Sequence, residues 1–151
     1  MKTIKGDLIA LAKTGEFDVI AHGCNCFCNM GAGIAKSIKA AFPLVALDDS
    51  NTIKGDNLKL GTIRSVGVTR KTSQFVVVNA YTQYRYGRGL HADYEAIRSC
   101  MKYLKEQYSG KRIGLPLIGC GLAGGDWNIV SKIIEEELGD EDVTIVEYQK
   151  G

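Results

Sequence analysis

Residues 21–42 read AHGCNCFCNMGAGIAKSIKAAF, and this stretch contains the features from which the fold is most directly inferred. It starts where a short apolar run, residues 17–21, predicts a buried strand. A loop rich in glycine and asparagine follows. Residues 31–42 then place Ile34, Ala35, Ile38 and Phe42 on one face of a predicted helix, and because proline cannot continue a helix we expect it to stop at Pro43.

The order of strand, loop and helix recurs along the rest of the chain. Apolar runs predict further strands, and apolar residues at three- and four-residue steps predict further helices. The strands are predicted over residues 62–68, 75–80, 112–116 and 143–146, and the helices over residues 91–108 and from a cap at Asp126 to about 138. This alternation predicts a layered α/β domain with a mixed or mostly parallel sheet.

The composition is typical of one globular domain. The chain has 151 residues, of which 45% are hydrophobic and 24% charged, and it contains no repeat or linker-like segment, so we expect a single domain over residues 1–151. No apolar run reaches the roughly 18 residues of a membrane span. The charged N-terminus does not resemble a secretory signal, so we expect a cytoplasmic protein that does not bind membranes. We also expect a monomer. The net charge of +2 is too small to indicate a nucleic-acid partner.

Histidine and cysteine alternate at His22, Cys24, Cys26 and Cys28, which raises the question of a metal site. Zinc ligands are usually spaced as Cys-x2-Cys or wider, because alternate residues of an extended segment crowd a tetrahedral site. The other candidate ligands stand alone in the sequence: His91, Cys100 and Cys120. We therefore expect no metal and no cofactor, and we interpret the five cysteines as reduced thiols that pack.

Two glycine-rich segments, residues 21–35 and 116–127, each follow a predicted strand and open a predicted helix. Glycine allows backbone N–H groups to approach a phosphate, and a helix N-terminus adds unsatisfied donors. The two loops could hold a diphosphate between them, or they could be tight turns without a ligand. The dinucleotide pattern GxGxxG is not met because Lys36 occupies the third glycine position, and no phosphate-binding lysine motif is present, so a dehydrogenase or a nucleoside triphosphatase is disfavoured.

Four segments occur in a characteristic order over essentially the whole chain. They are residues 6–8 (Gly-Asp-Leu), 22–25 (His-Gly-Cys-Asn), 30–35 (Met-Gly-Ala-Gly-Ile-Ala) and 116–122 (Pro-Leu-Ile-Gly-Cys-Gly-Leu). Together they resemble the macro domain family, in particular the small stand-alone macro domains that process free or attached ADP-ribose. The resemblance implies a three-layer α/β/α fold, with a mixed, mostly parallel central sheet flanked by helices.

The resemblance also implies where ADP-ribose would bind. Asp7 would accept a hydrogen bond from the adenine amino group, with Leu8 and Ile9 beside it, unless it only caps a turn. Tyr148, or an aromatic residue of segment 81–84, would lie near adenine or ribose. The remaining implied binding residues are Asn29, Met30, Gly31, Ala32, Gly33 and Ile34 in the first loop, and Ile118, Gly119, Cys120, Gly121 and Leu122 in the second.

Macro domains differ in their chemistry, and two departures bear on this chain. The deacylating members use a lysine after the central strand and an aspartate immediately after the Gly-x-Gly-Leu of the second loop, whereas segment 81–88 has no lysine and Ala123 takes the aspartate position. The phosphatase-like members instead resemble this chain in having a histidine before the asparagine of the first loop and Gly-Gly-Asp-Trp (residues 124–127) in the second. This resemblance would make His22, Asn25 and Asp126 catalytic. A histidine near neutral pKa can protonate a leaving oxygen or activate water, and a carboxylate can orient that water. Alternatively, His22 is a buried strand-end residue and Asp126 a helix cap.

The leading hypothesis is therefore an enzyme that binds ADP-ribose and hydrolyses the phosphate monoester of ADP-ribose-1''-phosphate to ADP-ribose. The alternatives are a non-catalytic ADP-ribose binding module and a hydrolase that removes ADP-ribose from protein or nucleic acid. A separate possibility is a nucleic-acid surface built from basic and aromatic side chains, which would otherwise be an ordinary solvated edge. The residues of that surface are Arg64, Arg70, Lys71, Tyr81, Tyr84, Arg85, Tyr86 and Arg88.

Overall fold

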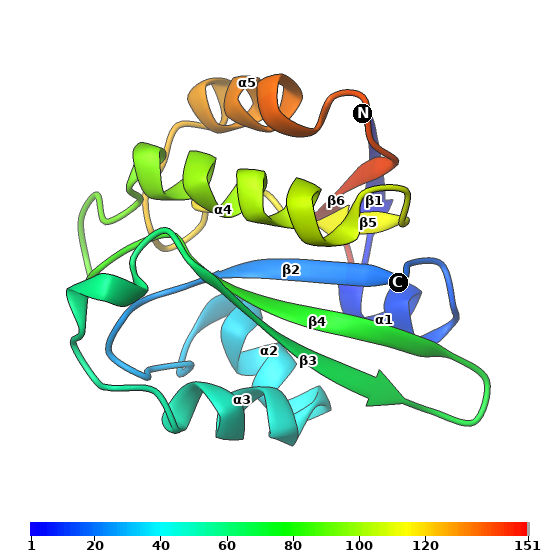
Figure 1. Cartoon of the computed structure of the whole chain (residues 1–151), viewed down its shortest axis with the longest axis horizontal. Helices are drawn as coiled ribbons and strands as arrows, with labels where there is room; N and C mark the ends of the chain where they lie inside the picture. Colours follow the sequence, from blue (N-terminus) through cyan, green and yellow to red (C-terminus); the bar gives the residue numbers. More distant parts are fainter. Residues whose placement is uncertain (151) are drawn as a thin grey trace.

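The computed structural model describes residues 1–150 as a six-stranded sheet between two layers of helices (Figure 1). The strands are β1 (Lys2–Gly6), β2 (Val19–Cys24), β3 (Ile63–Thr69), β4 (Gln74–Tyr81), β5 (Ile113–Leu115) and β6 (Val143–Tyr148). The helices are α1 (Leu8–Lys13), α2 (Gly33–Ala41), α3 (Pro43–Ser50), α4 (Tyr94–Tyr108) and α5 (Trp127–Leu138), with a 3-10 turn η1 (Asn57–Lys59).

The strand order in the sheet is β1-β6-β5-β2-β4-β3. Every neighbouring pair is parallel except β3 and β4, which are antiparallel, so the prediction of a mixed, mostly parallel sheet is confirmed. Because β1, β6, β5, β2 and β4 all run the same way, their carboxyl ends lie at one edge of the sheet. Ligands of open α/β sheets bind outside this edge.

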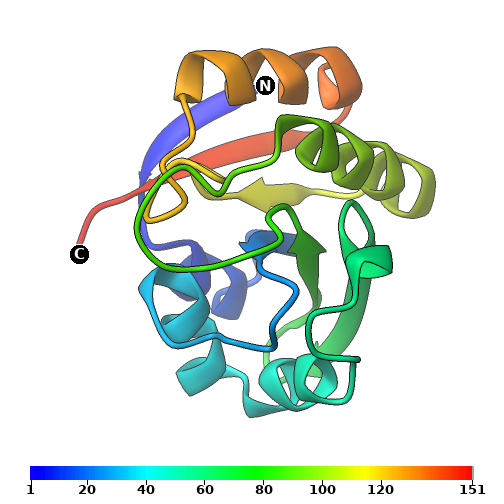
Figure 2. The ribbon, with the colours of Figure 1, turned by 90° about the vertical axis from the view of Figure 1, so that its left-hand side faces the viewer.

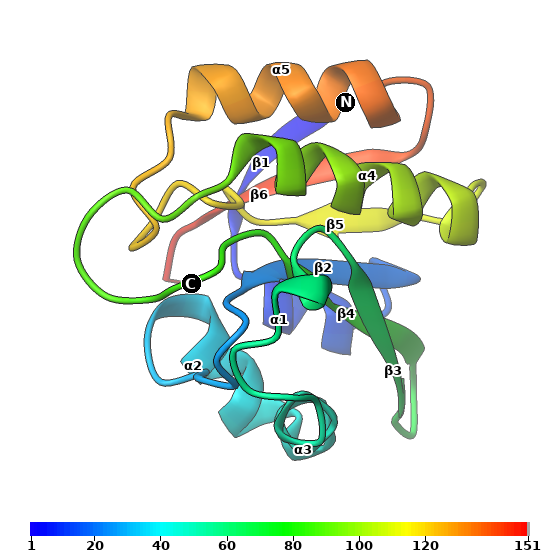
Figure 3. The same cartoon turned by 60° about the vertical axis from the view of Figure 1, so that its left-hand side comes forward.

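Helices cover both faces of the sheet, as Figure 3 shows: α4 and α5 lie on one side, and α1, α2 and α3 on the other. Each face has its own apolar core. Strand β2 contributes to both cores, because Val19 and Ala21 pack on the side of α4 and α5 whereas Ile20 packs on the opposite side. This alternation is the two-residue period of a strand buried on both faces. The three-layer α/β/α fold is confirmed.

Two helices were absent from the sequence expectations. Helix α2 does end just before Pro43, but a new helix, α3, begins at Pro43 itself. Proline is well tolerated in the first turn of a helix, because the N–H groups there have no acceptor within the helix. Helix α1 is only six residues long and starts at the cap Asp7. No helix within residues 1–150 has both the length and the apolar character needed to cross a membrane.

Candidate ligand-binding site

The two glycine-rich loops come together because they follow neighbouring parallel strands. Loop one (residues 25–32) leaves β2, loop two (residues 116–126) leaves β5, and these strands pair in the sheet. In Figure 2 both loops lie on the same side of the molecule, together with the connection from β4 to α4. Between them is a cavity of about 1590 Å³, which also reaches the ends of β1 and β6.

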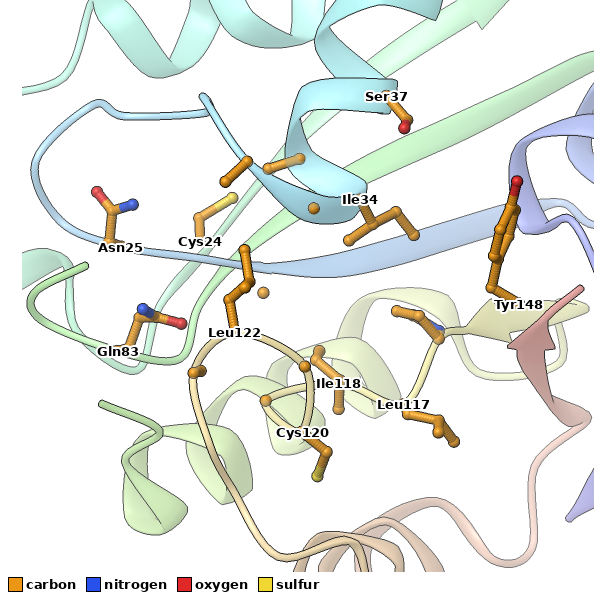
Figure 4. Close-up of a pocket in the computed structure, with 18 of the residues that line it drawn as sticks. Cys24, Asn25, Ile34, Ser37, Gln83, Leu117, Ile118, Cys120, Leu122 and Tyr148 are labelled. Atoms are coloured by element: carbon orange, nitrogen blue, oxygen red, sulfur yellow. The ribbon is translucent and has the colours of Figure 1, made fainter. Parts of the chain in front are cut away.

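The cavity has two ends with different side chains (Figure 4). Cys24, Asn25 and Gln83 lie together at one end, whereas Tyr148 and Ser37 lie at the other. We call these the Asn25 end and the Tyr148 end.

The wall of the cavity on the side of loop one is the N-terminus of α2. Its cap residue, Ala32, offers no side-chain hydrogen bond to the helix, and the first turn carries no acidic residue. The first N–H groups of a helix have no acceptor within it, and they form the positive end of the helix dipole. Ala32, Gly33 and Ile34 all line the cavity, so an uncapped helix end faces it.

Loop two forms the opposite wall and holds its shape by its own backbone hydrogen bonds. These bonds run from Ile118 N to Pro116 O, from Cys120 N to Leu117 O, from Gly124 N to Gly121 O and from Gly125 N to Gly119 O. Within residues 1–150, the N–H groups of Gly119, Gly121 and Leu122 donate to no protein acceptor. A Cβ atom on Gly33 would lie 3.5 Å from Leu122 Cδ1, so the start of α2 and loop two are in near contact across the cavity.

At the Tyr148 end, Asp7 is both a helix cap and a cavity residue. Its Oδ1 accepts hydrogen bonds from Ile9 N at 3.0 Å and Ala10 N at 3.2 Å, and its Oδ2 accepts none from the described residues. Leu8 and Ile9 line the cavity beside it. Tyr148 is 72% exposed and also lines the cavity, so an aromatic face and a carboxylate lie at the same end.

At the Asn25 end, the side chain of Asn25 closes loop one into an arc. Its Nδ2 donates to Asn29 O at 2.8 Å, and its Oδ1 accepts from Phe27 N at 2.9 Å. Asn25 and Asn29 both line the cavity. Of the expected binding residues, only Met30 and Gly31 do not line it: Met30 is buried in the core, and Gly31 N donates to Asn29 Oδ1.

His22 and Asp126, expected to be catalytic, lie outside the cavity lining. His22 is fully buried on the face of the sheet opposite α4 and α5, and its Nε2 lies 2.6 Å from Asn79 Oδ1. Burial lowers the pKa of His22 to about 4, against the weaker opposing effect of that hydrogen bond. Asp126 caps α5 by accepting a hydrogen bond from Asn128 N at 2.9 Å. In the structure His22 therefore contacts Asn79 within the sheet, and Asp126 caps α5.

The sequence analysis assigned no role in ADP-ribose binding to several residues of the site. Gln83 and residues 86–89, between β4 and α4, line the cavity, as do Lys13 and Ser37. The available signal was that this connection follows the carboxyl end of a central strand, where ligand sites form. Asp7, Lys13 and Arg88 are the charged residues of the lining.

The cysteines of the site are poor nucleophiles. Burial raises the pKa of Cys120 to about 11, and burial likewise raises the pKa of Cys24 well above its ordinary value. Within residues 1–150, no three His, Cys, Asp or Glu side chains are arranged to hold a metal ion. The predicted basic and aromatic surface is also interrupted: Tyr81 is fully buried, and Arg64 forms an ion pair with Asp48 at 2.7 Å.

Comparison with known proteins agrees with this geometry. The model of the Macro domain family matches residues 21–134. The chain belongs to the macro domain family. Macro domains bind ADP-ribose, and the relatives of this one include ADP-ribose glycohydrolases.

Two curated relatives and one solved structure illustrate the similarity. The macro domain is 35% identical to a 17.5 kDa protein of Enterobacteria phage T4 from the tk–vs intergenic region, with 99% of this chain and 97% of the phage protein covered. It is 30% identical to the ADP-ribose glycohydrolase OARD1 of Homo sapiens, with 96% and 88% covered. The fold is similar to that of Thermosipho africanus DarTG in complex with ADP-ribose, with a TM-score of 0.79, 20% identity, and 97% of this chain and 40% of that chain covered.

Proposed function

We propose that this macro domain binds ADP-ribose, with the diphosphate between the first turn of α2 and loop two. The observation that carries the proposal is that unpaired backbone N–H groups line one cavity from both sides. Such groups, with the positive end of a helix dipole, form an anion site. The adenine would lie at the Tyr148 end beside Asp7, and the distal ribose at the Asn25 end beside Asn29.

Calorimetric titration with ADP-ribose, AMP and NAD tests the binding proposal. We expect saturable binding with a preference for ADP-ribose over AMP, because AMP has one phosphate and no distal ribose and so leaves the Asn25 end empty. Equal affinity for the two ligands, or no binding of ADP-ribose, would contradict the placement of the diphosphate between the loops.

The proposed reaction is hydrolysis of ADP-ribose-1''-phosphate to ADP-ribose and phosphate. It is supported by Arg88, which lines the same cavity as Asn25 and forms no ion pair within residues 1–150. Water would attack the phosphorus and the bond from phosphorus to the ribose oxygen would break, with the proton lost by the water ending on that oxygen, while the guanidinium offsets the charge that develops on the phosphate. In this scheme Asn25 orients the distal ribose.

Phosphate release from ADP-ribose-1''-phosphate tests the reaction. We expect Arg88→Gln to lower kcat/KM at least about tenfold, which is the cost of about 1.4 kcal/mol of lost stabilisation. Arg70→Gln is the matched control, because Arg70 is exposed in the turn between β3 and β4 and does not line the cavity. Asp126→Ala should keep its activity, and a large loss in this variant would restore Asp126 as a catalytic residue.

A second candidate is removal of ADP-ribose from a protein carboxylate, favoured by the 30% identity to human OARD1, named an ADP-ribose glycohydrolase. Since segment 81–88 contains no lysine, the bond at the distal ribose would be cleaved by water without a lysine adduct. Release of ADP-ribose from modified protein, with no phosphate release from the phosphate ester, would favour this candidate. Tight ADP-ribose binding with neither activity would identify a non-catalytic binding module.

A further inference from the structure

A group of polar side chains packs against the outer side of loop one, away from the ligand. We call it the loop-one support and define it as Cys28, Asp49, Thr52, Lys59 and Tyr81. None of the five lines the cavity, so the group lies outside the site described above. Asp49, Lys59 and Tyr81 are buried, with exposed fractions of 2%, 8% and 0%.

Lys59 is the unusual member, because it is a buried cation without a carboxylate partner within 4 Å among the described residues. Its Nζ donates to Thr52 Oγ1 at 2.8 Å and to Cys28 Sγ at 3.7 Å, and it lies 5.4 Å from the centre of the Tyr81 ring. Burial of an ammonium group costs free energy that an apolar residue of similar volume would avoid. Packing alone therefore does not explain why a lysine occupies this buried position.

Those contacts reach the arc of loop one through Cys28. The arc runs from Asn25 to Asn29 and is closed by the hydrogen bond from Asn25 Nδ2 to Asn29 O. Cys28 lies inside it with a φ of 56°, the one positive φ of a non-glycine residue within residues 1–150. Such a conformation is unfavourable for cysteine and persists only where its surroundings impose it. Here Cys28 Sγ donates to Asp49 O at 3.3 Å and accepts from Lys59.

The support is in turn anchored to the sheet. Tyr81 is the last residue of β4 and pairs with Cys24, the last residue of β2, from which loop one departs. The hydroxyl of Tyr81 donates to Asp49 Oδ1 at 2.7 Å, and burial followed by this contact raises the pKa of Tyr81, so the hydroxyl remains a donor. A second tie joins the same segments, because Gly55 N donates to Cys26 O at 2.7 Å.

We propose that Lys59 is a positioning residue that holds the arc from Asn25 to Asn29 in the shape that receives the distal ribose. The inference rests on the proposed binding of ADP-ribose. Lys59 acts through Cys28 and touches no ligand. It follows that Lys59 contributes to the affinity for ADP-ribose but not to that for ADP, which lacks the distal ribose.

The experiment compares the affinities for ADP-ribose and ADP in Lys59→Met, which removes the ammonium group but keeps a side chain of similar length. We expect the affinity for ADP-ribose to fall about tenfold, as for a misplaced hydrogen-bonding group. The affinity for ADP should stay within about twofold, since its contacts lie elsewhere. Lys54→Met, an exposed lysine of the same connection, is the matched control and should change neither affinity.

A purely structural role for Lys59 would lower both affinities together, so an unchanged ratio of the two in Lys59→Met overturns the inference. If that variant does not fold, Cys28→Ala replaces it, because this change removes the contact with loop one and leaves the bond from Lys59 to Thr52. The same loss of preference for ADP-ribose is expected, and an unchanged preference overturns the inference. A wild-type protein without any preference for ADP-ribose over ADP would instead contradict the proposed function.

Discussion

Acidification should destabilise this protein through one buried histidine. His22 is fully buried, its Nε2 lies 2.6 Å from Asn79 Oδ1, and its Nδ1 has no hydrogen-bond partner in the described structure. Protonation would place a charge in the middle of the sheet, next to the amide of Asn79 and the thiol of Cys24 and without a carboxylate partner within 4 Å among the described residues. This is why burial lowers the pKa of His22 from 6.5 to about 4.

The sign and size of the effect follow from that difference in pKa. The unfolded chain binds the proton at 6.5 and the folded chain only near 4, so protons favour the unfolded state. The contribution of neutral His22 to the free energy of unfolding is fully present above pH 6.5. It declines as the pH falls from 6.5 to about 4, and below about pH 4 it is lost. The loss amounts to roughly 3 kcal/mol, at about 1.4 kcal/mol for each pH unit of difference. That is a large part of the 5–15 kcal/mol typical of a domain.

Urea unfolding followed by Trp127 fluorescence, at intervals from pH 7 to pH 4, measures this loss. The control is His22→Gln, which keeps a polar side chain beside Asn79 but cannot take up the proton. Surface ion pairs such as that between Asp18 and Arg112 also weaken in acid, but they do so in both proteins, so the difference between the two curves isolates His22. If the free energy of unfolding fell equally with pH in the wild type and in His22→Gln, the assignment of a buried, neutral histidine would be refuted. A role for His22 in proton transfer would then be open again.

Three further substitutions test the site and its supports. Asp126→Ala should cost about 1 kcal/mol of stability in urea unfolding, as expected for a lost helix cap, with unchanged calorimetric binding of ADP-ribose. Gly23→Ala would place a Cβ atom 2.5 Å from Thr82 Oγ1, so it should destabilise by about 1–3 kcal/mol, and unaltered stability would mean that this contact relaxes freely. Asp7→Asn keeps an N-cap but removes the charge at the proposed adenine position, so ADP-ribose affinity should fall about tenfold with little change in the unfolding midpoint.

The fold was largely predictable because its elements carry strong local signals. The apolar run of β4 and the three- and four-residue periodicity of α4 and α5 are present in the sequence, and each lies within a few residues of its prediction. Helix α3 was missed for a physical reason: proline marks the end of one helix and equally suits the first turn of another. Helix α1 is too short to show a period and depends on its cap and its packing.

The site was predictable where it consists of backbone and less so where it depends on side chains. Glycine-rich segments after strands signal loops that can face a phosphate, and both loops do line the cavity. Gln83 and Arg88, between β4 and α4, were given no role in ADP-ribose binding, because nothing in a single sequence shows that they face the same cavity as Asn25. The support behind loop one was invisible for the same reason, since Lys59 and Cys28 lie 31 residues apart.

The surroundings of His22 could be predicted from the sequence only in part. Side chains alternate along a strand, so His22 shares its face of the sheet with Ile20, and Gly23 lies on the other face with Ala21. The apolar character of Ile20 already indicates that this face is buried, but it does not reveal Asn79, which pairs with His22 on the neighbouring strand. The pairing of β2 with β4 continues for two residues past His22, to Cys24, so His22 stays enclosed within the ladder. The cavity begins only after it, at Gly23, Cys24 and Asn25.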